Sequence, residues 1–76
     1  PIENNYLHLE FPKRLMGQKV EVRLVDISGR IFYQNNVAVK NTVMDIKLGN
    51  QNLAEGIYLL QLSHKQEQKS LRLLVR

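Results

Sequence analysis

Few residues in this sequence have the chemistry and the spacing that catalysis needs. The chain has two histidines, His8 and His64, and these are its only side chains suited to acid–base work near neutral pH. Neither has a carboxylate at the sequence spacing typical of a metal site or a catalytic triad. The absence of cysteine removes thiol nucleophiles and thiolate zinc ligands. We therefore predict no catalytic residue, no metal ligand, no cofactor and no enzymatic activity.

Two further patterns resemble sites but are explained more simply by turns. Asp26 beside Ser28 has the residue types of a nucleophile with its partner, yet the stretch 26–29 is typical of a hairpin turn in which Asp accepts backbone N–H bonds. A phosphate-binding loop needs several glycines ahead of a helix. The four glycines stand singly, at positions 17, 29, 49 and 56.

The charge balance is basic but diffuse. Eleven Lys and Arg face seven Asp and Glu, a net charge of +4, which would weakly favour anionic partners such as acidic glycans or lipid head groups. No block of like charges occurs, so we interpret most of these charges as a solvated surface. Aromatic residues interleave with basic ones as in single-strand nucleic-acid binders, but strand aromatics are usually core, and we predict no nucleic-acid partner. No run is long enough to span a membrane, and we predict no direct membrane insertion. The aromatic residues concerned are Tyr6, Phe32, Tyr33 and Tyr58.

Alternation of apolar and polar residues predicts short strands that would position these side chains. Strand 57–62 is apolar on nearly both faces, which predicts a central place in a sheet. Asn35, Asn36 and Asn41 interrupt the pattern after 30–34, and we expect a short connection there with a bulge or a change of sheet. The predicted strands cover residues 6–11, 20–24, 30–34, 44–48, 57–62 and 69–75.

Turn signals every eight to twelve residues or so leave no room for crossover helices. The fold class predicted is therefore all-β, an antiparallel sandwich or small barrel of about six or seven short strands. At 76 residues, the chain is long enough for a single domain, 1–76. A start at Pro1 rather than Met leads us to expect a fragment of a larger protein.

Three stretches carry a family resemblance when taken together. The first is Pro1, a polar spacer and strand 6–11; the second is strand 20–25 followed by the Asp-x-x-Gly-Arg turn 26–30; the third is the Leu-x-x-Gly-Ile-Tyr sequence 53–58, followed by a basic last strand. They resemble the C-terminal sorting domain of the Bacteroidetes type IX (Por) secretion system, in its short common form. The resemblance covers essentially the whole chain and keeps the family's order and spacing.

This resemblance implies a non-catalytic, Ig-like β-sandwich at the end of a secreted protein. Its partners would be protein components of the outer-membrane translocon, which read the domain as an address, and a sortase-like peptidase, which removes it when the cargo is attached to anionic lipopolysaccharide. The protein would be exported, passing through the periplasm to the cell surface or the medium. The parent protein would be either a cargo or a part of the secretion machinery.

A folded tag needs an accessible strand edge or tail for its reader. The last strand, 69–76, is our candidate because it is extended, basic and terminal. Unpaired edges would also allow two copies to dimerise. The alternative is a structural or carbohydrate-binding sandwich of a surface protein that uses Tyr6 or Tyr33. The candidate recognition residues are Arg30, Lys65, Lys69, Arg72 and Arg76, and the motif residues expected to serve backbone geometry are Asp26, Gly29, Gly56 and Tyr58.

Overall fold

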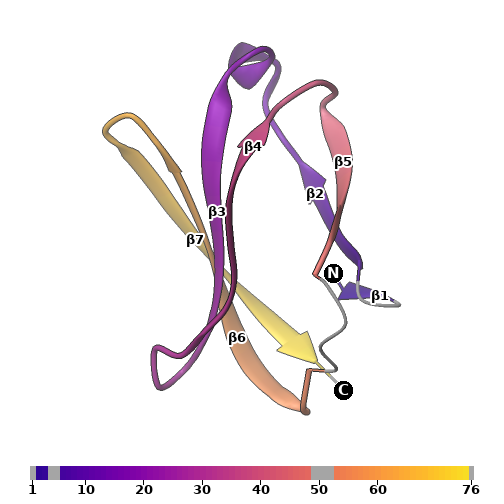
Figure 1. Ribbon diagram of the computed structural model, residues 1–76, viewed down its shortest axis with the longest axis vertical. Helices are drawn as coiled ribbons and strands as arrows, with labels where there is room; N and C mark the ends of the chain where they lie inside the picture. The colour runs from indigo at the N-terminus through magenta and orange to yellow at the C-terminus, as the bar shows by residue number, and fades with distance from the viewer. Residues whose placement is uncertain (1, 4–5, 49–52, 76) are drawn as a thin grey trace.

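The computed structural model describes residues 2–3, 6–48 and 53–75, which form two antiparallel sheets (Figure 1). The predicted all-β antiparallel fold is confirmed. None of the described residues belongs to a helix long and apolar enough to cross a lipid bilayer. The elements are β1 (Ile2–Glu3), β2 (Tyr6–Glu10), a 3-10 helix η1 (Lys13–Leu15), β3 (Lys19–Asp26), β4 (Ile31–Ala38), β5 (Val43–Lys47), β6 (Gly56–His64) and β7 (Glu67–Val75).

The two sheets differ in size. The first has the strand order β1-β2-β5, and the second has the order β4-β3-β6-β7. Strand β6 lies between β3 and β7, so its predicted central position is confirmed. Strands β4 and β7 form the two edges of the larger sheet.

The core is built from the alternate residues that face the space between the sheets. Leu7 and Leu9 of β2, Val22 and Leu24 of β3 and Leu60 of β6 are all at most 6% exposed. No polar or charged residue is fully buried among those described, so the hydrophobic effect dominates the packing between the sheets. The remaining core residues are Phe11, Leu15, Val20, Val39, Ile46, Leu48 and Tyr58.

The prediction for strand 30–34 was wrong at its end. Strand β4 continues through Asn35 and Asn36 to Ala38, paired with β3 throughout. Asparagine is disfavoured in strands, but both residues are exposed on an edge strand, where the backbone ladder outweighs a weak side-chain preference. The irregularity lies earlier, because Leu24 pairs with Tyr33 and Val25 with Ile31. Phe32 is therefore the extra residue of a β-bulge.

The expected change of sheet occurs between β4 and β5. Val39 is buried, its N–H donates to the carbonyl of Gln18 (2.9 Å), and its carbonyl accepts the N–H of Gly17 (2.8 Å). These two bonds hold the end of β4 against the start of β3 before the chain crosses to β5. The stretch 49–52, whose glycine and asparagines predict a loop, lies outside the described residues.

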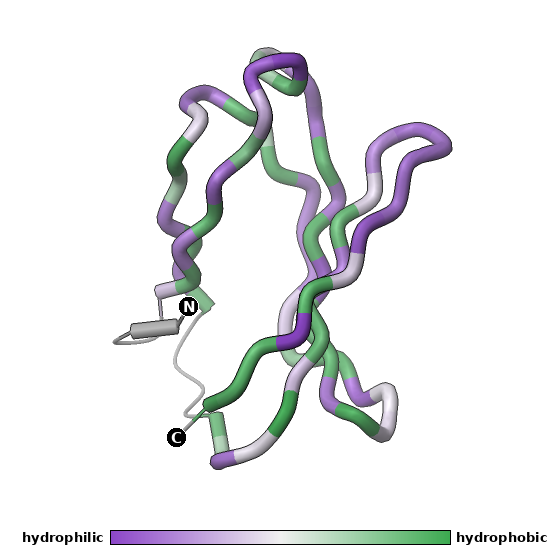
Figure 2. Tube along the Cα trace, turned by 180° about the vertical axis from the view of Figure 1, so that it is seen from behind, coloured by the Kyte–Doolittle hydropathy of each residue, from purple (hydrophilic) through white to green (hydrophobic). Residues whose placement is uncertain are grey.

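The hairpin between β6 and β7 turns tightly, because His64 and Glu67 are paired across it. Lys65, at its tip, has φ +55°, the one positive φ among the described non-glycine residues. Figure 2 shows that this hairpin is hydrophilic at the tip and more hydrophobic toward its base. A lysine in a left-handed conformation is strained.

Replacing Lys65 by Gly tests this strain. The left-handed conformation costs a non-glycine residue about 1–2 kcal/mol, and the greater chain entropy of glycine offsets about 0.5–1 kcal/mol of the relief. We expect Lys65→Gly to raise the free energy of unfolding by about 0.5–1 kcal/mol in urea titrations. Gln66→Gly, next to it at a φ that is not positive, should lower it; a loss of stability in both variants would contradict the assignment.

Candidate recognition surface

The two distinctive sequence motifs meet at one end of the larger sheet. Asp26, which opens the Asp-x-x-Gly-Arg turn, pairs in register with Tyr58 of the Gly-Ile-Tyr segment. Residues 32 positions apart therefore form one structural unit. We call this end, built around Asp26, Arg30, Phe32 and Tyr58, the motif end.

A single carboxylate organises the turn at the motif end. Asp26 Oδ1 accepts the N–H of Ser28 (2.9 Å), the hydroxyl of Ser28 (2.7 Å) and the N–H of Arg30 (2.9 Å). The hydrogen bond from the Ser28 hydroxyl is the main reason that the pKa of Asp26 lies below its usual value. Gly29 has φ +91°, a conformation that disfavours any residue with a Cβ atom.

Aromatic and cationic groups pack beside this turn. The guanidinium of Arg30 lies 4.7 Å from the centre of the Phe32 ring, as in a cation–π contact. Phe32 meets Tyr58 edge to face, with ring centres 5.5 Å apart. Tyr58 is 4% exposed and its hydroxyl donates to the carbonyl of Ala54 (2.7 Å). Gly56 lies between Ala54 and Tyr58 and begins β6. Its φ of +152° is a backbone conformation that residues with a Cβ atom rarely adopt.

The outer face of the larger sheet is apolar near the motif end. Ile31, Ile57 and Leu74 come from three different strands and are 50%, 40% and 58% exposed. Ile57 pairs directly with Leu74, and Val25 connects Ile31 to Leu59 in the neighbouring row. Leu59 in turn pairs with Arg72. An apolar patch thus lies across the four strands beside Arg72, exposed at Ile31, Ile57 and Leu74. We call it the outer patch, and its residues are Val25, Ile31, Ile57, Leu59 and Leu74.

The other half of the same face is polar. Gln34, Arg23, Gln61 and Ser70 form one cross-strand row over the four strands. Arg23 lies 3.7 Å from Glu21 through one of its terminal nitrogens, while its Nε is buried without a hydrogen-bond partner in the described part of the chain. The outer face of the larger sheet is therefore polar near the β6–β7 hairpin and apolar near the motif end.

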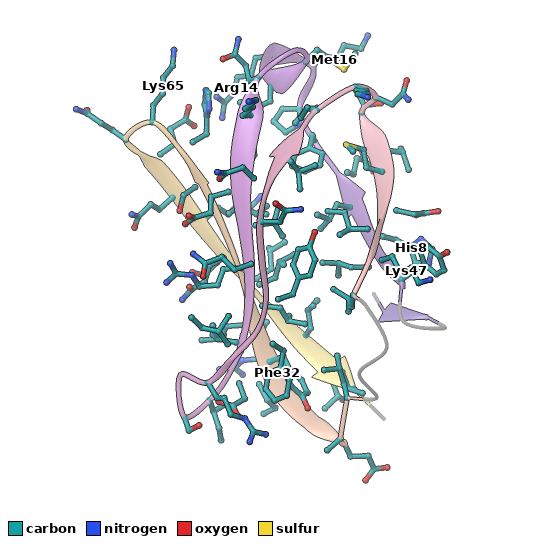
Figure 3. All side chains as sticks on the ribbon, viewed as in Figure 1. His8, Arg14, Met16, Phe32, Lys47 and Lys65 are labelled. Atoms are coloured by element: carbon teal, nitrogen blue, oxygen red, sulfur yellow. The ribbon has the colours of Figure 1, made fainter. Side chains whose placement is uncertain are left out.

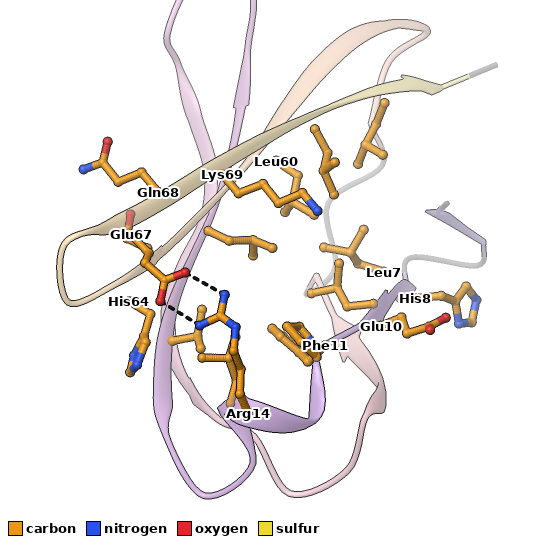
Figure 4. A pocket seen from close by; sticks show the side chains of 18 of the residues that line it. Leu7, His8, Glu10, Phe11, Arg14, Leu60, His64, Glu67, Gln68 and Lys69 are labelled. Carbon is orange, nitrogen blue, oxygen red and sulfur yellow. Dashed lines mark hydrogen bonds and ion pairs between the residues drawn. The ribbon is translucent and has the colours of Figure 1, made fainter.

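A groove of about 630 Å³ opens between β2 of the smaller sheet and β6 and β7 of the larger one (Figure 4). Core residues such as Leu7, Phe11 and Leu60 line it. On the inward face of β7 the apolar residues are Leu71, Leu73 and Val75; none is fully buried, and Leu71 is 37% exposed. The smaller sheet does not reach across β7, so its inward face remains partly open.

One ion pair closes an end of the groove. Arg14, in η1, donates two hydrogen bonds to the carboxylate of Glu67, at the start of β7, with lengths of 2.7 and 2.6 Å. Figure 4 shows this pair spanning the mouth of the groove. The hydrogen bonds from Arg14 lower the pKa of Glu67, and Glu67 raises the pKa of Arg14.

The structure does not gather the candidate recognition residues into one patch. Lys65 lies at the hairpin tip, whereas Arg30 lies over Phe32 at the opposite end of the molecule (Figure 3). Along β7, Lys69 shares the inward face with Leu71, and Arg72 shares the outer face with Leu74. Arg76 is outside the described residues. Strand β7 therefore carries two of the five candidates, one on each face.

The two histidines lie near the surface, each at a polar contact with a residue distant in the sequence. The β2–β5 register brings His8 against Asp45, and their side chains form a hydrogen-bonded pair at the surface. His64 Nδ1 lies 3.4 Å from the carbonyl oxygen of Lys19. No three potential ligands among His, Cys, Asp and Glu come together to hold a metal ion in the part of the chain described.

The two tyrosines of the carbohydrate-binding alternative, Tyr6 and Tyr33, differ from each other in exposure. Tyr6 is 41% exposed, but Tyr33 faces Leu24 and packs against the core. Of the two rings, Tyr6 is thus the more exposed to a glycan.

Sequence reasoning missed Arg14, Glu67 and the outer patch. The ion pair joins residues 53 positions apart, and no local pattern indicates such a contact. The outer patch did leave a signal, because Ile57, Leu59 and Leu74 are apolar residues at positions whose alternation assigns them to the solvent face. For Ile57 and Leu59 the same signal also predicts the central position of their strand, whereas Leu74 is an extra apolar residue on an edge strand.

Removal of the Tyr58 hydroxyl tests the packing at the motif end. Tyr58→Phe keeps the ring contact with Phe32 but leaves the Ala54 carbonyl without its donor, so we expect unfolding to require about 0.5–1.5 kcal/mol less in urea titrations. Tyr33→Phe is the matched control, since the Tyr33 hydroxyl makes no hydrogen bond to another described residue. Equal losses in both variants would show that the Ala54 bond contributes nothing.

Acid titration tests the role of Asp26. Its pKa is lowered by folding, so the stabilisation it provides is fully present above the usual Asp pKa of about 3.9 and is lost as the pH falls through the lowered value. We expect Asp26→Asn to melt below the wild type at pH 7 and the difference to disappear toward pH 2. A difference in melting temperature that does not change with pH would contradict this role.

Comparison with known families places these features in context. A family model described as the secretion system C-terminal sorting domain matches residues 3–76. Neither a curated protein nor a solved structure matches the chain. The match includes both motifs that meet at the motif end as well as the whole of β7, and the resemblance derived from the sequence is confirmed. Domains of this kind direct export to the cell surface by type IX secretion and are not normally catalytic. The chain therefore belongs to the secretion system C-terminal sorting domain family.

Proposed function

We propose that the domain is a folded address whose last strand, β7, is the part that the outer-membrane translocon reads. The observation that carries this proposal is the position of β7. It is an edge strand of the larger sheet and pairs only with β6 among the described strands. Seven of its nine residues are exposed. A reader therefore has access to both the backbone edge and the side chains of the last strand.

The basic side chains of β7 support a direct role in recognition. Lys69 and Arg72 are exposed and have no ion-pair partner within the described residues. Arg72 also lies next to the outer patch through its pairing with Leu59. A positive charge beside apolar surface is a common composition for a protein-binding surface.

The motif residues act indirectly in this proposal. Asp26, Gly29, Gly56 and Tyr58 set the geometry where β3 ends and β6 begins. Because β7 pairs with β6 along its whole length, an error there would shift the strand that is read. A secretion defect on mutation of these residues would then come from misfolding.

After export, a sortase-like peptidase would remove the domain when the cargo is attached to anionic lipopolysaccharide. The domain would pass through the periplasm as part of its parent protein and would leave the cargo at the cell surface or in the medium. Family membership supports these steps.

Fusion of residues 1–76 to a periplasmic reporter, expressed in a type IX-competent cell, tests the proposal. We expect the fusion to reach the surface and Arg72→Glu to reduce surface reporter at least about fivefold while the melting temperature is retained. Lys47→Glu, on an exposed position of β5, is the matched control and should be exported normally. Undiminished export after deletion of residues 69–76 would overturn the role of the last strand.

A further inference from the structure

Strand β7 offers a long pairing edge that no other described strand occupies. It is nine residues long and the larger sheet ends there within the described part of the chain. The edge of β2, on the other side of the groove, is shorter and is partly covered by β1, which pairs with Tyr6 and Leu7. An extended segment that enters this side of the molecule would find its longest row of backbone partners on β7.

The side chains next to this edge are suited to apolar residues of such a segment. On the inward face, Leu71 and Leu73 lie over a groove whose opposite wall includes Leu9 and Phe11. On the outer face, Leu74 extends the outer patch to the last strand of the sheet. A fifth strand in this sheet would cover apolar surface on both faces.

The charged side chains beside the edge favour an incoming strand of one charge sign. Lys69 faces inward and lies in the groove near Leu60 (Figure 4), while Arg72 faces outward. Neither has an acidic partner among the described residues, since Glu67 is bound to Arg14 at the end of the groove. Glu10 lies on the far wall, in β2. The edge itself therefore presents two positive charges and no unpaired negative charge.

We propose that the edge of β7 binds an extended acidic segment of another protein as an added antiparallel strand. Residues directly opposite in an antiparallel pair place their side chains on the same face. The incoming strand would therefore carry acidic residues opposite Lys69 and Arg72 and apolar residues opposite Leu71, Leu73 and Leu74. This inference names the chemistry of the partner that the proposed function requires, and it rests on that function.

A second copy of this chain is a poorer occupant of the same edge. Its β7 would bring two more positive charges to an edge that is already basic. Charged side chains on edge strands, including those that point inward, are a known protection against self-pairing. The same two residues that disfavour a second copy would attract an acidic strand.

Synthetic peptides test the inference with the 76-residue chain. The acidic probe is Thr-Val-Val-Glu-Val-Thr-Asp-Thr with blocked ends, which places Glu opposite Arg72 and Asp opposite Lys69. The basic probe replaces Glu and Asp by Lys. We expect the acidic probe to bind at least about tenfold more tightly in calorimetry and the double variant Lys69→Glu, Arg72→Glu to reverse the preference. Lys47→Glu is the matched control and should leave the preference unchanged.

Methylation of the probe's backbone distinguishes strand pairing from simple charge attraction. An added strand points alternate N–H groups at its neighbour, so methylation of one alternate set should abolish binding and methylation of the other set should be tolerated. Equal binding of both methylated probes, equal binding of the acidic and basic probes, or a wild-type chain that forms dimers through β7 would each overturn the inference. Export of the reporter fusion together with any of these results would leave the proposed function standing and remove only the acidic-strand partner.

Discussion

The last strand of this domain is held in the sheet by one neighbour. Among the strands that the structure describes, β7 makes its backbone ladder with β6 alone, and the smaller sheet leaves its inward face partly uncovered. A sandwich with sheets of unequal width has such an edge by necessity, because the wider sheet extends past the other. The groove, the exposed leucines and the accessible cations of β7 all follow from this one mismatch.

At the motif end, the motif residues mainly set backbone geometry. Two glycines with positive φ and one carboxylate that accepts three hydrogen bonds fix where β3, β4 and β6 begin or end. The Tyr58 ring and the Arg30–Phe32 contact then hold the two motifs against each other. Strand β7 pairs with β6 along its whole length, so the side chains presented at the edge depend on a correctly formed β6. The residues that define the sequence pattern and the residues available to a partner are thus different sets.

Much of the fold could be predicted from alternation, because a half-buried strand repeats its burial every two residues. Leu7 and Leu9 in β2, and Tyr58 and Leu60 in β6, are buried as that pattern requires. The end of β4 could not be predicted, because Asn35 and Asn36 remain in the ladder through their backbone pairing with β3. The bulge at Phe32 also depends on that pairing. Of the candidate surface, the position of Lys69 and Arg72 on opposite faces of β7 follows from their spacing of three, but the Arg14–Glu67 pair and the groove arise only when the two sheets come together.

The central claim is that the outer edge of β7 is unpaired in the isolated domain. Amide hydrogen exchange, followed residue by residue by NMR, measures this directly. Amides of β6 from Tyr58 to Ser63 lie between partners in β3 and β7, so we predict slow exchange along that stretch, whereas in β7 slowly exchanging amides should alternate with rapidly exchanging ones. Uniformly slow exchange along β7 would show that its edge is already occupied and would contradict the account.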